Sequence, residues 1–167
     1  NCRILPESMA RAEVYKIQWE NKSSLEKACR GVDVIVHAAG MNASDCFSDP
    51  TEALRVNGLA TANLLYSGIS SGVKKFLYIS TGHIYNNPLQ GNVNEACAPE
   101  NSHPYASSHF AGEQVIRFAN QRDLINGVVI RLSNGYGKPM YQDANCWMLL
   151  VNDLCRQAIE KGEMLLN

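Results

Sequence analysis

The sequence predicts an α/β fold built around a parallel β-sheet. Apolar runs that contain β-branched residues alternate with helical segments along the chain. The run at residues 32–36, Val-Asp-Val-Ile-Val, is almost continuously apolar, which is typical of a strand buried on both faces of a parallel sheet. A chain of 167 residues is long enough to bury a core, and its length fits one domain.

Strands and helices are expected to alternate from one end of the chain to the other. The predicted strands, rich in β-branched and aromatic residues, are residues 14–19, 32–36, 74–80 and 127–132. The predicted helices are residues 23–29, 50–71, 105–122 and 145–162.

Local signals set the ends of these helices. Ser23 is expected to cap the first helix, and Gly31 to end it. Asp49 is expected to cap the long helix, and Pro50 fits its first turn because a proline there loses no intrahelical hydrogen bond. The last helix has an apolar face and ends near Gly162.

The composition excludes several classes of protein. Lys plus Arg is 15 and Asp plus Glu is 16, so the net charge is −1. That balance speaks against a nucleic-acid-binding surface made of bulk positive charge and against a polybasic membrane anchor. Hydrophobic residues are 46% and charged residues 19%, which are ordinary values for a globular protein. No apolar run reaches the length that spans a membrane.

The cysteines and histidines form no metal-binding pattern. None of the 6 cysteines belongs to a C-x-x-C pair, and no two histidines share a helix at ligand spacing. We therefore expect no metal site, and we expect reduced thiols in a cytoplasmic protein.

Small and polar residues follow the predicted strands where the strands end. In a parallel sheet these carboxyl ends meet at one edge, and ligands bind in the crevice beyond them. The residues expected there are Ala38, Ala39, Gly40, Thr81, Ser133 and Asn134. Tyr105 opens a helix after the loop at residues 82–104, whose length is typical of functional loops.

Six stretches occur together in a characteristic order. They are G-V-D-V-I-V-H-A-A from Gly31, D-P at Asp49 through V-N at Asn57, A-T-A-N-L-L from Ala60, Y-I-S-T-G-H-I-Y from Tyr78, P-Y-x-x-x-H-x-x-G-E from Pro104, and R-L-S-N-G-Y-G from Arg131. The ordered set spans nearly the whole chain and resembles the extended short-chain dehydrogenase/reductase family of nucleotide-sugar epimerases, dehydratases and reductases.

The resemblance implies a Rossmann-type doubly wound parallel sheet, an NAD or NADP cofactor and hydride-transfer chemistry. It implies that Tyr105 is the catalytic acid/base, that Thr81 is the catalytic hydroxyl residue and that His109 stands in the place of a catalytic lysine. The residues implied to contact the cofactor are Gln18, Ala38, Ala39, Gly40, Asn57, Ser80, Tyr105 and His109. Those implied to contact the substrate are Thr81, His83 and Asn134.

The histidine at position 109 departs from the family pattern. A phenol transfers a proton well only if its pKa falls from about 10 toward the working pH. The family achieves this with a lysine four residues after the tyrosine, on the same face of the helix. An unperturbed histidine is mostly neutral at pH 7. We therefore expect reduced activity or an altered pH optimum.

Two further departures concern the reaction and the extent of the chain. Gly82 and His83 replace the acidic pair of the sugar 4,6-dehydratases, which speaks against that reaction. The Gly-rich turn G-x-x-G-x-x-G is absent, and the G-Y-G at residues 135–137 lies too late to replace it. By the resemblance, Gln18 stands where an aspartate usually binds adenine, and the chain lacks the first strand of the fold and its Gly-rich turn.

We expect residues 1–137 to be a partial NAD(P)-binding domain and residues 138–167 to begin the smaller substrate-binding region. We also expect the natural protein to be longer at both ends. The choice between NAD and NADP stays open, since Arg3 is only a weak hint of a 2′-phosphate.

Two functions remain open. The first is an NAD(P)-dependent epimerase, dehydratase or reductase that acts on a nucleotide sugar or a similar hydroxyl or carbonyl substrate. The alternative is a catalytically degenerate NAD(P)-binding sensor or scaffold of the same fold. A small-molecule substrate is the expected partner, with no nucleic acid and no membrane, and a homodimer is one arrangement to test.

Overall fold

The computed structural model describes residues 9, 11–86, 88–139, 144 and 146–166. The chain divides into two compact units, one formed by Tyr15–Ser133 and the other by Asn1–Val14 together with Asn134–Asn167. Arg3, considered above, lies outside the described residues.

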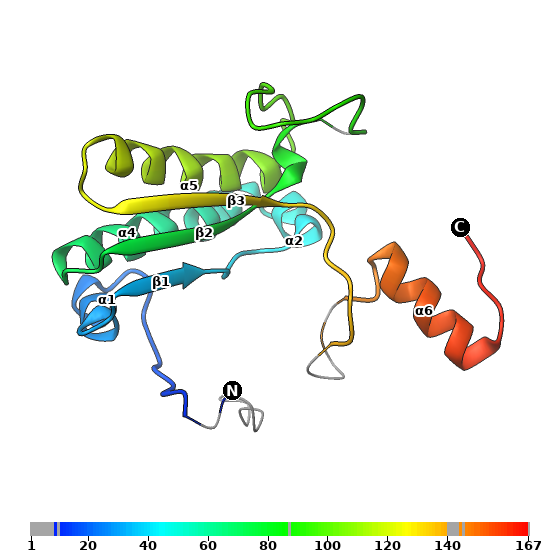
Figure 1. Cartoon of the computed structure of the whole chain (residues 1–167), viewed down its shortest axis with the longest axis horizontal. Helices are drawn as coiled ribbons and strands as arrows, with labels where there is room; N and C mark the ends of the chain where they lie inside the picture. The colour runs from blue at the N-terminus through cyan, green and yellow to red at the C-terminus, as the bar shows by residue number, and fades with distance from the viewer. Residues whose placement is uncertain (1–8, 10, 87, 140–143, 145, 167) are drawn as a thin grey trace. The chain divides into compact units, whose positions relative to one another are not determined.

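The unit Tyr15–Ser133 is built on a parallel sheet of three strands in the order β1-β2-β3 (Figure 1). The strands are β1 (Val34–His37), β2 (Lys75–Thr81) and β3 (Asn126–Leu132). Their register pairs His37 with Tyr78 and Thr81 with Leu132, so all three carboxyl ends lie at one edge of the sheet. The fold is Rossmann-type α/β, as the sequence predicts.

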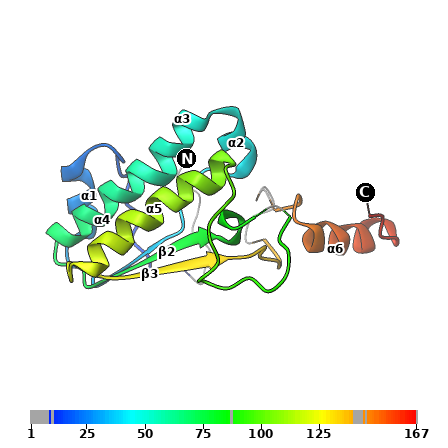
Figure 2. The same ribbon diagram turned by 90° about the horizontal axis from the view of Figure 1, so that it is seen from above.

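Helices pack on one face of this sheet. They include α1 (Lys22–Cys29), α4 (Thr61–Ser70) and α5 (Pro104–Gln121), and α4 and α5 run side by side (Figure 2). The apolar core lies between the helices and the sheet. Its buried members are Leu25, Cys29, Leu64, Leu65, Val73, Phe76, Tyr78, Ile116, Ala119 and Ile125.

The long helix begins and ends as predicted, but its middle is π-helical. It consists of α3 (Pro50–Ala53), η2 (Leu54–Ala60) and α4, and the Asp49 carboxylate caps it by accepting the N–H of Glu52 at 2.9 Å. π-helical turns are rare and occur frequently at functional sites. This one contains Asn57, which is fully buried.

The strand expected at residues 14–19 is not formed. The segment carries no strand assignment and lies outside the hydrogen-bonded order of the sheet. Alternating β-forming residues become a strand only where a neighbouring strand pairs with their N–H and C=O groups. The expected cap Ser23 is also wrong, because Asn21 caps α1 by accepting the N–H of Ser24 at 3.1 Å.

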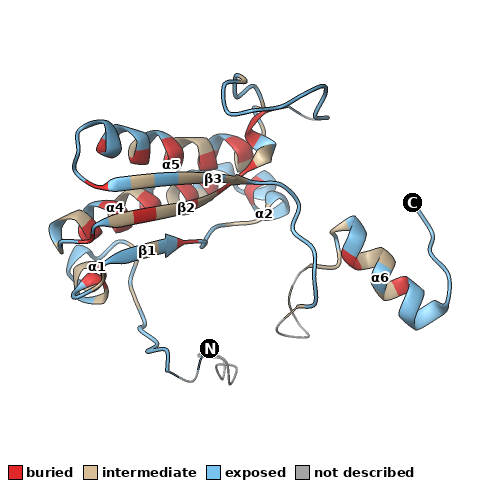
Figure 3. Ribbon diagram, viewed as in Figure 1, coloured by how far each residue is buried: buried red, intermediate tan, exposed pale blue. Residues whose placement is uncertain are grey.

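The expectation that residues 32–36 are buried on both faces is wrong for one face. Val34 is 47% exposed and Val36 is 62% exposed, whereas His37 is buried. In β3, exposed residues alternate with half-buried ones along the strand (Figure 3). An apolar run cannot by itself tell whether a second layer covers the strand, and within the described part of this unit the face of Val34 and Val36 stays accessible.

Two short helices flank the carboxyl ends of the strands. One of them, α2 (Ala43–Ser48), is not among the predicted helices, although Asn42 caps it by accepting the N–H of Asp45 at 3.0 Å. After β2 the chain forms the 3₁₀ turn η3 (Gly82–Ile84) and then an irregular loop that leads to α5.

The other unit contains α6 (Leu150–Lys161), which begins later than predicted and ends at Gly162 with a φ of 72°. The Asn152 side chain accepts the N–H of Gly137 at 2.9 Å and donates to the Cys146 carbonyl at 3.2 Å. In the described chain, no helix is long and apolar enough to cross a membrane. Its five cysteines (29, 46, 97, 146 and 155) are free thiols.

We predict that Gly112→Ala destabilises the fold. A Cβ at Gly112 would lie 2.9 Å from the Tyr78 hydroxyl oxygen and 3.0 Å from the backbone oxygen of Asn57, so α5 or η2 must shift. Overpacking of this kind costs about 1–3 kcal/mol, more than the gain of about 0.5–1 kcal/mol from alanine in a helix. Chemical denaturation measures the change.

Gly58→Ala is the matched control for this substitution. Its Cβ would lie 3.7 Å from the Ala111 Cβ, which is an ordinary contact. The free energy of unfolding should stay constant or rise by up to about 1 kcal/mol. Equal losses in the two variants would contradict the close approach at Gly112.

Candidate active site

The structure brings Thr81 and Tyr105 together at the carboxyl edge of the sheet. Thr81 is the last residue of β2 and is buried, and Tyr105 lies in the first turn of α5 and is half-buried. His103 begins this helix by accepting the N–H of Tyr105 on Nδ1 at 3.1 Å. The Tyr105 hydroxyl interacts with the Thr81 side chain.

The surroundings of Tyr105 keep its phenol protonated. Burial raises the pKa of Tyr105, and the interaction with the Thr81 hydroxyl lowers it by a smaller amount. The unperturbed pKa of a tyrosine is about 10, so Tyr105 carries its proton at neutral pH. In this state the phenol is a proton donor.

His109 lies one turn after Tyr105 and touches its ring. The ring centroids are 4.6 Å apart at an interplanar angle of 68°. Nδ1 of His109 lies 2.9 Å from the Tyr78 hydroxyl. Burial lowers the pKa of His109 to about 4, with a smaller contribution from His37. His109 is therefore neutral at pH 7 and brings no positive charge to Tyr105.

A stack of buried rings extends from His109 into the core. Tyr78 stacks on His109 with centroids 5.9 Å apart, and His37 stacks on Tyr78 at 5.5 Å. Nε2 of His37 lies 2.9 Å from the Thr61 hydroxyl. Burial lowers the pKa of His37 to about 4, so it too is neutral at pH 7. We call His37, Tyr78, His109 and Tyr105 the ring stack.

His37 and Tyr78 are not among the site residues predicted from the sequence. The signal that could have found them is their register, because the two residues are paired on adjacent parallel strands and face the same side of the sheet.

Asn57 connects the loop after β1 to α5. Its Oδ1 accepts the N–H of Met41 at 2.8 Å, and its Nδ2 donates to the Ser108 hydroxyl at 3.0 Å. Its backbone carbonyl accepts the Thr61 hydroxyl at 2.7 Å. Asn57 is fully buried, and these hydrogen bonds use both polar groups of its side chain.

The loop after β1 passes close to this network and is open to solvent. Ala38, Ala39 and Gly40 are exposed. A Cβ at Gly40 would lie 3.0 Å from Oδ1 of Asn57 and 3.4 Å from Cε1 of His109. A side chain larger than that of glycine would therefore be crowded at position 40, between Asn57 and His109.

Ser80 lies two residues after Tyr78 on the same face of β2, nearer the carboxyl end of the strand. Its hydroxyl donates to the Glu113 carboxylate at 2.5 Å, and Arg131 forms an ion pair with the same carboxylate at 2.8 Å. The Tyr85 hydroxyl accepts from Arg131 at 2.7 Å. The Ser80 side chain is therefore committed to this buried ion pair.

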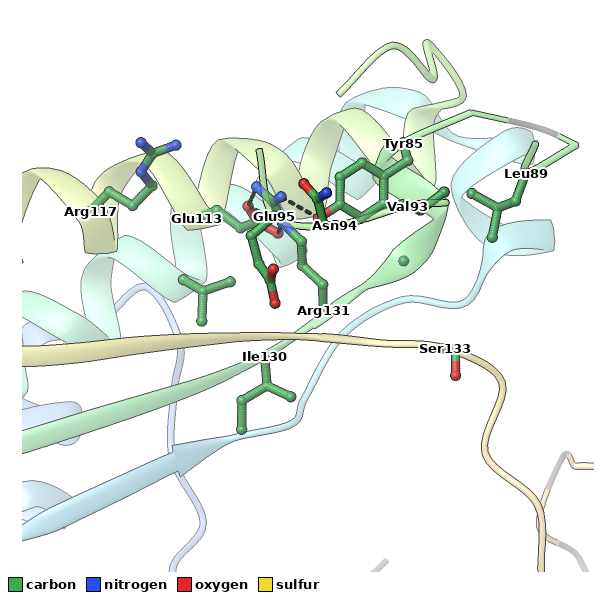
Figure 4. A pocket seen from close by; sticks show the side chains of 12 residues that line it. Tyr85, Leu89, Val93, Asn94, Glu95, Glu113, Arg117, Ile130, Arg131 and Ser133 are labelled. Carbon is green, nitrogen blue, oxygen red and sulfur yellow. Dashed lines mark hydrogen bonds and ion pairs between the residues drawn. The ribbon is translucent and has the colours of Figure 1, made fainter. Parts of the chain in front are cut away.

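A cavity of about 690 Å³ adjoins the ion pair (Figure 4). Glu113, Arg131 and Tyr85 line it together with residues of the loop after β2, whereas Tyr105 and His109 do not. The catalytic candidates thus lie outside this cavity.

The remaining predicted residues lie apart from Thr81 and Tyr105 or at their margin. Gln18 is exposed, and its side-chain oxygen accepts from Asn21 at 3.4 Å. It lines a separate cavity of about 600 Å³ with Trp19 and Arg55. His83 is exposed, and its ring lies edge-on to Tyr105 at 6.2 Å.

Asn134, predicted to meet the substrate, belongs to the other compact unit. The described residues contain no group of three or more histidine, cysteine or acidic side chains that could hold a metal ion.

A sequence model of the NAD dependent epimerase/dehydratase family matches residues 3–164 of the chain. The dTDP-D-glucose 4,6-dehydratase of Mus musculus is 31% identical over 113 residues, which cover 67% of this chain and 32% of that protein. The uronate dehydrogenase of Pseudomonas putida is 27% identical over 160 residues, which cover 95% of this chain and 58% of that protein. The chain thus spans about a third of the length of the first relative and just over half of the second.

Solved structures share the fold. RMD from Pseudomonas aeruginosa, complexed with NADPH, superimposes with a TM-score of 0.74 at 24% identity, covering 93% of this chain and 56% of that one. The UDP-glucose 4-epimerase of Thermus thermophilus, in complex with NAD, gives a TM-score of 0.73 at 24% identity, covering 85% of this chain and 46% of that one.

We predict that stability falls as the pH drops from 6.5 toward 4. His37 and His109 have a pKa of about 4 in the folded chain, whereas an unfolded histidine titrates near 6.5. The unfolded state therefore binds more protons in this window, and the free energy of unfolding should fall by about 2 kcal/mol per histidine by pH 5. Urea denaturation at pH 7, 6 and 5 measures the loss.

His83→Asn is the control, because His83 is exposed and lies outside the ring stack. This variant should show the same loss between pH 7 and 5 as the parent protein. A free energy of unfolding that stays constant over this range would contradict the burial of two neutral histidines.

Proposed function

The chain belongs to the NAD-dependent epimerase/dehydratase family, and from this premise we propose that it carries the catalytic residues of an NAD(P)-dependent epimerase or reductase. Its substrate would be a nucleotide sugar or a similar hydroxyl or carbonyl compound. The observation that carries the proposal is the meeting of Tyr105 with the Thr81 hydroxyl at the carboxyl edge of a parallel sheet, with His109 against the tyrosine ring. Relatives named for dTDP-D-glucose, UDP-glucose and uronate support the substrate class.

The residues beside Gly40 fit a nicotinamide cofactor. The exposed loop at Ala38, Ala39 and Gly40 would receive it, and His109 would meet it beside Gly40. NAD or NADP supplies a hydride acceptor or donor when bound. Gln18 would contact its adenine end. The 167 residues contain no G-x-x-G-x-x-G turn for the pyrophosphate.

Two hydroxyl groups would handle the substrate oxygen. Thr81 would hold that oxygen by a hydrogen bond, and Tyr105 would donate its proton to it as the carbon is reduced. Because burial raises the pKa of Tyr105, the phenol is already in the form that donates at neutral pH. This state favours reduction of a carbonyl over oxidation of a hydroxyl, which requires the phenolate.

The residues after Thr81 narrow the reaction. Gly82 and His83 offer no carboxyl group there. Elimination of water from a sugar needs an acid that protonates the leaving oxygen and a base that removes the proton from the adjacent carbon. We therefore favour epimerisation or reduction over 4,6-dehydration. His83, whose ring lies edge-on to Tyr105, would contact the substrate, as would Asn134.

Some expectations about the whole protein belong to the same proposal. They are that residues 1–137 form part of the cofactor domain, that residues 138–167 begin the substrate-binding region, that the protein is cytoplasmic, and that two copies pair as a homodimer. Light scattering on the full-length protein tests the last of these.

Tyr105→Phe is predicted to abolish turnover while NAD(P)H still binds. The loss of a general acid costs about 10²- to 10⁴-fold in rate. The test uses the full-length protein and measures NADH and NADPH binding by fluorescence, then turnover of nucleotide-sugar candidates by nicotinamide absorbance. Tyr66→Phe, on an exposed tyrosine of α4, is the matched control and should be fully active.

The outcomes separate the two functions left open by the sequence. Turnover that requires Tyr105 supports the enzyme. Binding of NAD(P)H without turnover of any candidate identifies the sensor or scaffold of the same fold. Absence of NADH and NADPH binding in the full-length protein contradicts both.

We predict that His109→Lys increases the rate of substrate oxidation at pH 7. An ammonium beside Tyr105 would lower the pKa of the phenol and raise the fraction of phenolate, which is the base that oxidation needs. The pH at which oxidation reaches half its maximum should fall by about one unit or more. Because the site is buried, the variant should also be less stable.

His109→Gln separates charge from packing. It keeps a polar, neutral side chain at this position, so it should not shift the pH profile. An oxidation rate in His109→Lys that is equal to or below that of the parent at every pH would show that a lysine is not the missing element.

A further inference from the structure

We propose that Tyr78 is a positioning residue whose hydroxyl holds His109 as the Nε2–H tautomer, so that His109 presents a neutral N–H donor to a ligand hydroxyl beside Gly40. This rests on the proposed function in one respect: the ligand hydroxyl is taken to belong to bound NAD(P). Tyr78 controls the tautomer of His109 in the free protein, whether or not a ligand binds.

The first step is the choice of acceptor for the Tyr78 proton. The hydroxyl lies 2.9 Å from Nδ1 of His109 and 3.5 Å from the backbone carbonyl of Asn57. It also interacts with the Thr61 hydroxyl, whose own proton goes to the Asn57 carbonyl. The shorter distance is normal for a hydrogen bond, and the longer one is at the limit. The Asn57 carbonyl already accepts the Thr61 hydroxyl at 2.7 Å. Tyr78 therefore donates to Nδ1, and Nδ1 must be unprotonated.

The tautomer of the neighbouring His37 is fixed in the same way. The single proton of the Thr61 hydroxyl goes to the Asn57 carbonyl, which can only accept. Nε2 of His37, 2.9 Å from the same hydroxyl oxygen, must then be the donor. Both histidines of the ring stack are thus Nε2–H tautomers, each fixed by a hydroxyl whose other partners are known.

The other ring nitrogen of His109, Nε2, lies beside Gly40. Nε2 lies 3.5 Å from the point that a Cβ at Gly40 would occupy, so it faces the exposed loop. Within the described chain, every buried side-chain nitrogen and oxygen has a hydrogen-bond partner. Nε2 of His109 has no protein partner among these residues, so it must reach solvent at the Gly40 loop. A neutral N–H there suits a hydroxyl acceptor.

The carboxylate of Glu113, one turn after His109, is paired with Arg131 of β3, so its charge is already balanced. The titratable groups near His109 and its partners lie on β1, β2 and α2 and on α5 itself. They are Tyr78 of β2, His37 of β1, Cys46 of α2, and Tyr105 and Glu113 of α5. His37 disfavours a proton on His109, and burial does so more strongly, lowering the pKa of His109 to about 4.

The direct test is the ¹⁵N spectrum of His109 in the full-length protein at pH 7. We expect a protonated Nε2 and an unprotonated Nδ1 in the parent. In Tyr78→Phe the two nitrogen shifts should move toward each other, because both tautomers become populated. Tyr85→Phe is the matched control, since it removes a buried tyrosine hydroxyl that bonds to Arg131 instead. Its His109 spectrum should match the parent.

The second measurement is the binding of NADH and NADPH by fluorescence titration. Tyr78→Phe should weaken binding by about 3- to 10-fold, which is the loss expected for one neutral hydrogen bond. In a His109→Ala background the same substitution should change the Kd by less than a factor of about 2, since the two sites are coupled through the histidine. This result would show that Tyr78 acts through His109.

The outcomes keep the two proposals apart. A protonated Nδ1 in the parent, or a tautomer unchanged by Tyr78→Phe, overturns the inference even if NAD(P)H binds. Equal weakening of binding in the His109→Ala background also overturns it. If the parent binds neither NADH nor NADPH, the proposed function fails, and the ¹⁵N spectrum still decides whether Tyr78 fixes the tautomer.

Discussion

The close crossing of η2 and α5 is the constraint on which the rest of the site depends. Gly112 allows it, since a side chain there would meet the Asn57 carbonyl and the Tyr78 hydroxyl. At this crossing the Asn57 carboxamide joins Met41 after β1 to Ser108 on α5. These are buried hydrogen bonds, and losing one partner leaves the other unsatisfied at a cost of about 1–3 kcal/mol. The loop after β1 and the helix that carries Tyr105 are therefore held in one arrangement.

One face of β2 carries two different kinds of interaction. Its register places Tyr78 beside His37, and α5 brings His109 and Tyr105 onto the same stack without a formal charge. Two residues later, Ser80 bonds to Glu113 in an ion pair with Arg131. Neutral rings and fixed charges are thus separated along a single strand, and the catalytic candidates lie with the neutral rings.

The sequence could predict those features that local signals determine. Asp49 and Pro50 mark the start of the long helix, and the order of motifs brings Thr81, Tyr105 and His109 to one edge. It could not predict the absence of a strand at residues 14–19 or the exposure of Val36, because both depend on which neighbours pair with or cover the segment. His37 and Tyr78 were missed for a related reason. Their roles arise from the register between strands far apart in the chain, which no single stretch of sequence encodes.

The protonated phenol of Tyr78 suits a neutral histidine at position 109. The negative charge of Glu113, one turn after His109, raises the pKa of Tyr78 and keeps its phenol protonated, although burial is the larger cause. A protonated phenol can donate to an imidazole nitrogen but offers no charge to balance an ammonium. A charged lysine among these buried rings would need a carboxylate partner, and the nearby Glu113 already forms an ion pair with Arg131. The buried environment therefore favours a neutral donor at position 109, and the tyrosine on β2 is the group that specifies which of its nitrogens donates.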